Sequence, residues 1–201
     1  MKTGLVSRYH PLLVTLHWLL AVLVVAMLCA GFLLLAPMPS TDPQKIGSLL
    51  IHMSVGMSIP ALMAVRFIVR MWTRRPADAT TGNRPLDRIA PVTHYGFYIL
   101  VLLMAGTGFA TAIRAGLNRS VFQGSGEPLP PSFASYPTFV AYGYVALLLA
   151  GLIALHVVAA LYHQFVGKDR LFRRMWFGQR FSGPRSPGSG ELTSGPVITS
   201  R

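Results

Sequence analysis

Acidic side chains are scarce in this chain, and the few present avoid its apolar stretches. The 201 residues include 6 Asp and Glu against 18 Lys and Arg, which gives a formal net charge of +12. Proton-coupled transporters use carboxyl groups inside the membrane, so the lack of acids there argues against that class. With only one cysteine, Cys29, the chain cannot form an internal disulfide.

The composition is too apolar for an ordinary soluble domain. Hydrophobic residues make up 52% of the chain, charged residues 12%, and the mean hydropathy is +0.50. Four runs reach the length of about 20 mostly apolar residues that a transmembrane helix needs. The runs are 11–36, 46–71, 91–113 and 138–165. The sequence therefore predicts an all-α membrane protein, a four-helix transmembrane bundle, with the first run too long for a signal-peptide core.

The distribution of positive charge predicts the orientation of the bundle. Lys and Arg gather before the first run, between the second and third runs, and after the fourth. The positive-inside rule then places both termini in the cytoplasm. This grouping explains the basic charge by membrane topology, so we expect a lipid bilayer and no nucleic acid as partner. We expect a multi-pass protein of the cell inner membrane.

The chain divides into one domain and a tail. Residues 1–178 hold the four runs and are predicted to form a single transmembrane domain. Residues 179–201 contain FSGPRSPGSG and are rich in Ser, Gly and Pro, so they are predicted to be a disordered cytoplasmic tail.

Two histidines stand at similar depth in the first and last runs. At about 1.5 Å per helical residue, His17 lies roughly 13 Å beyond Arg8, and His156 lies roughly 18 Å before Lys168. Both therefore belong to the cytoplasmic half. Two facing imidazoles on neighbouring helices can ligate a b-type heme from both sides. For either histidine alone, a hydrogen bond between helices is the alternative.

A third histidine, His52, lies near the opposite end of the second run and implies a separate site. The residue on the last run at the same depth and on the face of His156 is Tyr142, fourteen positions earlier. Tyrosine ligates heme iron less often than histidine does in electron-transfer proteins. A second heme therefore stays open: it could be five-coordinate, bound by Tyr142, ligated from elsewhere, or absent.

A cation accompanies the cytoplasmic-side histidines. Arg66, in AVRFIVRM, lies about 21 Å along the helix from His52 and hence near their depth. We expect Arg66 to pair with a heme propionate, with Arg70 as the second candidate. For Arg70, the favoured alternative is a side chain that extends to lipid phosphates.

These features together resemble the bacterial cytochrome b-561 family of four-helix membrane cytochromes, which includes superoxide oxidase. The resembling segments are RYHPLLVTLHWLL, IHMSVGMSIPALMAVRFIVRM, THYGFYILVLL and ALHVVAALYHQFVGKDRLFRRM. The resemblance implies two b hemes, one near each membrane face. His17 and His156 match the cytoplasmic-side pair, and His52 matches one ligand of the other heme. Tyr142 stands where the family pattern has the second histidine, so one heme is expected and a second is left open.

The resemblance also implies the chemistry. It predicts transfer of single electrons between a redox partner and ubiquinone or another membrane quinone. His94 and His163 match positions near the quinone, where an imidazole could hand a proton to a reduced quinone oxygen; the alternative is an interfacial histidine bound to headgroups or water. A superoxide donor would make the protein a superoxide:ubiquinone oxidoreductase; otherwise it is an electron carrier.

Two other functions remain as alternatives. One is a quinone-linked cytochrome b anchor subunit for a periplasmic dehydrogenase or hydrogenase. The other is a membrane protein without redox chemistry, in which the histidines would serve helix packing only.

Overall fold

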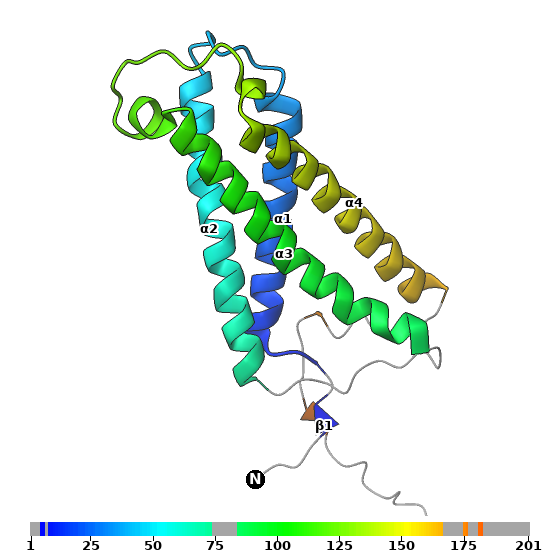
Figure 1. Ribbon diagram of the computed structural model, residues 1–201. Helices are drawn as coiled ribbons and strands as arrows, with labels where there is room; N and C mark the ends of the chain where they lie inside the picture. The colour runs from blue at the N-terminus through cyan, green and yellow to red at the C-terminus, as the bar shows by residue number, and fades with distance from the viewer. Residues whose placement is uncertain (1–4, 7, 74–83, 167–174, 177–180, 183–201) are drawn as a thin grey trace, which may run out of the picture.

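Four long helices dominate the computed structural model, which describes residues 5–6, 8–73, 84–166, 175–176 and 181–182. They are α1 (Pro11–Cys29), α2 (Lys45–Trp72), α3 (Arg84–Arg114) and α4 (Pro137–Phe165), shown in Figure 1. The segments long and apolar enough to cross a membrane are Pro11–Leu35, Lys45–Trp72, Val92–Arg114 and Pro137–Phe165. The predicted four-helix membrane fold is confirmed; helix α3 begins at Arg84, seven residues before the predicted start of its run at 91.

Helices α1 and α4 both begin at a proline. Pro11 and Pro137 each occupy the first helical turn, where the missing N–H has no partner within the helix to lose. His10 supplies a further start signal for α1, because its Nδ1 accepts a hydrogen bond of 3.3 Å from the backbone N–H of Leu12. Local sequence therefore sets where the two outer helices of the chain begin.

The end of the first span is a π-helix, η1 (Ala30–Leu35), that continues directly from α1. Lys45, the first residue of α2, secures it: its Nζ donates to the carbonyl oxygens of Leu35 at 2.5 Å and Met38 at 2.7 Å. The Lys45 side chain is only 5% exposed. An unpaired lysine would be costly to bury. Here its ammonium group donates to carbonyl oxygens that lack partners because the helix ends there.

The helices pack in two pairs, α1 with α2 and α3 with α4, and α2 also contacts α3. All four contribute to one central apolar cluster of buried side chains: Leu20, Leu28, Ile59, Met63, Val101, Ala146 and Leu149. Helices α1 and α4 are not a closely packed pair. In Figure 1 the lower half of α4 diverges from α1.

The two ends of the bundle differ, and we name them by their helices. The base is where α1 begins and α4 ends. The loop end is where α1 ends and α4 begins, and residues 36–44 and 115–136 cross it. The second loop contains η2 (Asn118–Phe122) and η3 (Phe133–Ser135) and covers a small cluster of Ala112, Leu117, Val121 and Leu129.

At the base, the first and last described segments meet. Strand β1 (Leu5–Val6) pairs antiparallel with β2 (Phe181–Ser182). Trp18 donates from Nε1 to the carbonyl oxygen of Met175 at 3.0 Å. Strand β2 falls within 179–201, the stretch predicted to be a disordered tail; the other residues of that stretch lie outside the described part of the chain.

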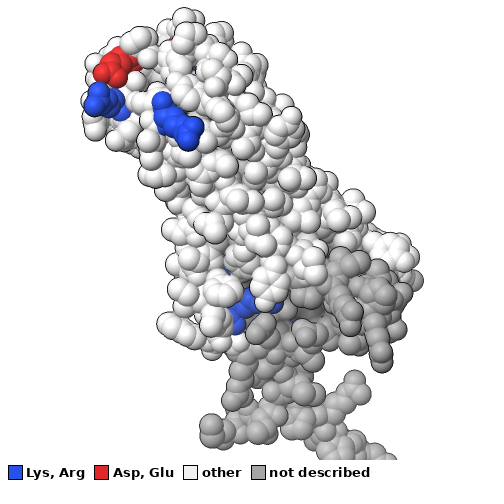
Figure 2. Space-filling model, in the orientation of Figure 1, with Lys and Arg blue, Asp and Glu red and all other residues white. Residues whose placement is uncertain are grey.

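The outer surface is apolar, as a lipid environment requires. Many large hydrophobic side chains of the four helices are exposed. Figure 2 shows a wide uncharged band along the bundle, with basic residues toward its two ends. The bundle therefore presents a mostly apolar surface to its surroundings, as a lipid environment requires.

Candidate functional site

Five of the six histidines gather toward the base, and each helix contributes to one polar cluster there. His17 of α1 interacts electrostatically with Arg66 of α2, His94 of α3 and His156 of α4. His156 also interacts with Arg66. The structure thus brings together His17, His156 and Arg66, as the sequence predicted, and adds His94 to the same group. We call these four residues the base cluster.

Arg66 is buried in the base cluster, and its guanidinium uses only part of its hydrogen-bonding capacity. Its side chain is 8% exposed, and Nη1 donates to the hydroxyl oxygen of Tyr98 at 3.1 Å. Its Nε is buried and has no hydrogen-bond partner among the described residues. Within that part of the chain the one ion pair is remote, between Arg119 and Glu127. A buried guanidinium without an anion is costly, so this position suits an anionic group that the protein binds.

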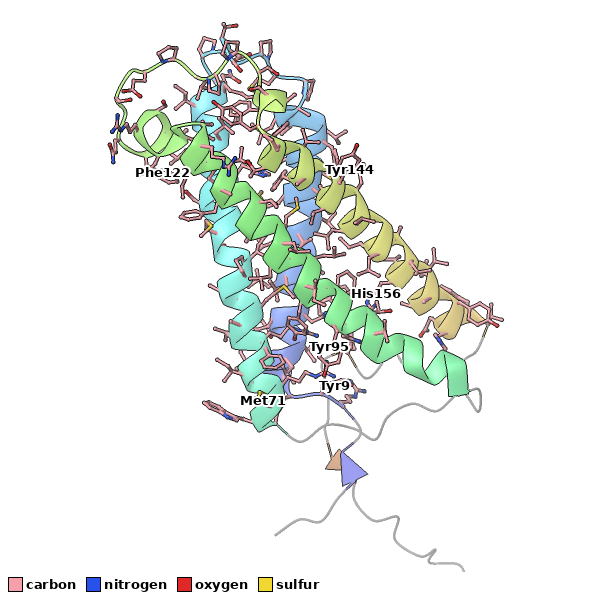
Figure 3. The ribbon with its side chains drawn as sticks, in the orientation of Figure 1. Tyr9, Met71, Tyr95, Phe122, Tyr144 and His156 are labelled. Atoms are coloured by element: carbon pink, nitrogen blue, oxygen red, sulfur yellow. The ribbon has the colours of Figure 1, made fainter. Side chains whose placement is uncertain are left out.

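Aromatic rings line the cluster. The His156 ring meets the rings of His94 and Phe97 edge-on, with centroids 6.1 and 5.4 Å apart. His17 meets Trp18 in the same way at 5.5 Å. Figure 3 shows His156 on the side of α4 that faces α3. The described residues give no hydrogen bond to the ring nitrogens of His17 or His156, so both imidazoles can serve as ligands.

The donor set at the base fits a heme. Two imidazoles stand on α1 and α4, helices that do not pack closely together, and aromatic side chains surround them. A buried cation with an unused N–H lies beside them. A porphyrin needs two axial ligands, apolar walls and a partner for its propionates, and these residues offer all three.

The loop end holds a different arrangement. His52 Nε2 and the Tyr142 hydroxyl oxygen are 3.1 Å apart, within hydrogen-bond distance. The Tyr142 ring packs over Gly108, where an added Cβ would come within 3.2 Å of Cε2. The Cε1 edge of His52 lies 3.6 Å from where Gly31 would carry a Cβ. This distance confirms the prediction that Tyr142 lies at the depth of His52.

The remaining candidates lie at the base. The His163 ring contacts the ring of its neighbour Tyr162, with centroids 5.9 Å apart. His163 is not among the residues that interact with His17 or His156. Arg70 is in the last turn of α2 and is half-buried. Of the two predicted quinone-side histidines, His94 meets the ring of His156, and His163 meets the ring of Tyr162.

Sequence reasoning missed three residues that shape the two sites. Tyr98, the partner of Arg66, comes four positions after His94, and this helical spacing puts both on one face of α3. Phe97, the aromatic residue before Tyr98, could have been predicted beside the same face. Gly108 is a glycine inside an apolar helix, and such a residue often marks a close approach by a neighbouring group.

A four-helix membrane bundle that brings half-buried histidines and a buried arginine together at one end is typical of one class, the membrane b-type cytochromes. The chain belongs to the prokaryotic cytochrome b561 family, whose pattern matches residues 8–178. It is therefore a multi-pass inner-membrane protein of a family that carries heme b and transfers electrons. The family resemblance read from the sequence is confirmed.

Three relatives align with this chain over nearly their whole length. Cytochrome b562 of Cereibacter sphaeroides is 31% identical, and the match covers 83% of this chain and 94% of the relative. A probable superoxide oxidase CybB of Yersinia pestis is 29% identical over 84% and 96%. Cytochrome b561 homolog 2 of Escherichia coli is 24% identical over 86% and 93%.

Proposed function

We propose that this protein moves single electrons between a redox partner and a membrane quinone through heme b held at the base. The observation that carries the proposal is the base cluster. It combines two imidazoles without hydrogen bonds among the described residues and a buried arginine whose Nε has no partner there. Membership of the family implies heme b, and the base cluster is the position that we propose for it.

Each residue of the cluster has a role in this proposal. Heme b would supply reversible one-electron chemistry when bound. His17 and His156 would hold the heme iron and so would join α1 to α4 through the cofactor. Arg66 offers its Nε–H to a propionate, and Tyr98 orients the guanidinium by its hydrogen bond to Nη1.

His94 is the favoured proton donor for the quinone. Its ring lies beside that of His156, so a quinone at this edge of the cluster would be near both the ligand and a titratable group. A ring nitrogen of His94 would give its proton to the quinone oxygen as that oxygen gains charge. His163, at the same end of the bundle, is the second candidate. Under the positive-inside rule the base faces the cytoplasm and the loop end the periplasm.

Superoxide is the electron donor suggested by one relative, the probable superoxide oxidase of Yersinia pestis. At the loop end of this chain, Arg119 pairs with Glu127 at 4.0 Å, and both side chains are exposed. An arginine already paired with a carboxylate attracts an anion less than an unpaired arginine would. The local charge therefore adds little support for superoxide, and the donor must be identified by reaction.

The test uses the full chain purified with its cofactor in detergent. A reduced-minus-oxidised absorbance spectrum should show the bands of a b-type heme, and quinone should reoxidise the reduced protein in stopped-flow mixing. Absence of heme bands would refute the proposal. Rapid reduction by superoxide would identify the protein as a superoxide:quinone oxidoreductase, whereas co-purification with a larger dehydrogenase or hydrogenase would favour the anchor-subunit function.

A further inference from the structure

We infer that this chain binds a single heme, at the base, and that a direct hydrogen bond between His52 and Tyr142 closes the loop-end position. The inference rests on the proposed function, because it concerns where that function's cofactor is held. It departs from the two-heme plan that the family resemblance implies.

The distance between the two side chains carries the inference. His52 Nε2 and the Tyr142 hydroxyl oxygen are 3.1 Å apart, so the two atoms that would have to bind iron bind each other. Metal bonds to nitrogen and oxygen ligands are about 2 Å long. An iron held between two axial ligands therefore needs them about 4 Å apart. The observed pair leaves no place for the metal, and still less for the porphyrin plane across the bond.

Each of the two rings also lies beside a glycine of another element. Tyr142 packs over Gly108 of α3, and the Cε1 edge of His52 packs beside Gly31 of η1. Either ring would need to turn away to admit a flat cofactor. His52 Nδ1 is buried and has no partner among the described residues. It is the ring nitrogen that does not face Tyr142, so it opens no coordination position between the two side chains.

No other histidine can replace Tyr142 as a ligand. All six histidines of the chain lie among the described residues, and the other five stand toward the base. The contrast with the base is direct. There, two histidines on separated helices carry no hydrogen bond within the described chain, whereas at the loop end the histidine is already engaged by the tyrosine.

The protein therefore does not carry electrons across the membrane through two hemes. Arg66 lies fourteen positions after His52 in α2, which is about 21 Å along the helix. With one heme, an electron entering at the loop end would have no carrier at that depth. Electron donor and quinone therefore both exchange electrons with the cofactor at the base.

The test counts heme per chain in the full-length purified protein, by pyridine hemochromogen absorbance and amino-acid analysis. We expect one heme in the wild type and in His52→Ala, and none in His17→Ala. Two hemes in the wild type, with one lost in His52→Ala, would overturn the inference and leave the proposed function standing. No heme in the wild type would overturn the proposed function itself.

A second experiment tests whether the loop-end position can be opened to heme. Tyr142→His places an imidazole opposite His52, and we expect the ratio to rise from one toward two, with a second low-spin ferric signal in electron paramagnetic resonance. Tyr142→Phe is the matched control, since it removes the hydroxyl but adds no ligand; its ratio should stay at one. If Tyr142→His also stays at one while the protein remains folded, Tyr142 is not what closes the position.

Discussion

The base and the loop end solve the same problem in opposite ways. Both bury polar side chains in an apolar bundle, where an unpaired polar group is costly. At the loop end the protein supplies most of the partners itself: Lys45 meets two carbonyl oxygens, and His52 meets Tyr142. At the base, Arg66 Nε is buried without a partner among the described residues, and no hydrogen bond within those residues engages the rings of His17 or His156; at the loop end, His52 Nδ1 is the buried nitrogen left without one. Unsatisfied groups that converge indicate a ligand site, and mutually satisfied groups indicate structure.

The largest expected effect is loss of the cofactor at the base. In His156→Ala we expect heme content to fall by at least tenfold, because one axial ligand and the link between α1 and α4 disappear together. Heme absorbance per protein measures it. His163→Ala, at the same end of the same helix, is the control and should retain its heme; equal loss in both variants would contradict the distinction between the two histidines.

The next largest expected effect concerns the positive charge of Arg66 at the base. Arg66→Gln removes a cation beside the proposed heme. Because loss of a nearby positive charge favours the oxidised state, the reduction potential should fall by tens of mV. A shift of about 59 mV corresponds to a tenfold change in the redox equilibrium. Redox titration followed by absorbance measures the shift. Arg66→Lys keeps the charge and should keep most of the potential. An unchanged potential in Arg66→Gln would show that the arginine does not interact with the cofactor.

At the loop end, the expected effect is on stability alone. Lys45→Met leaves the carbonyl oxygens of Leu35 and Met38 without their donor, which should lower the free energy of unfolding by about 1–3 kcal/mol. Thermal unfolding in detergent measures the loss, and heme content should be unchanged. Gln44→Ala is the control, since the Gln44 side chain is exposed and makes no cap hydrogen bond. Heme loss in Lys45→Met would mean that the two ends are not independent.

The smallest effect tests the packing behind Tyr142. Gly108→Ala would bring a Cβ within 3.2 Å of the Tyr142 ring, whereas at Gly106 a Cβ would meet nothing within 4 Å. Both changes gain helix propensity, so their difference isolates the contact. We expect Gly108→Ala to be less stable than Gly106→Ala by about 1 kcal/mol, as for a modest overpacking. Equal stability would show that the tyrosine ring is not held against α3.

Much of the site could be predicted because helices convert sequence spacing into depth. The match of His52 with Tyr142, and of His17 with Arg66 and His156, followed from 1.5 Å per residue and 100° per step. His94 was expected near the quinone, but its contact with the His156 ring depends on how α3 and α4 pack. Tyr98 as a partner of Arg66 was not foreseen, because a hydrogen bond between α2 and α3 requires their relative rotation.

The sequence by itself determined the four spans, their apolar faces and the depth of every buried polar residue, because hydrophobic length and helical periodicity are local properties of the chain. The tertiary structure alone decided which of those residues touch. It placed His17 and His156 in one cluster although their helices do not pack closely, and it closed His52 onto Tyr142. The difference arises because a hydrogen bond or a coordination position depends on distances between helices, and no single helix encodes those distances.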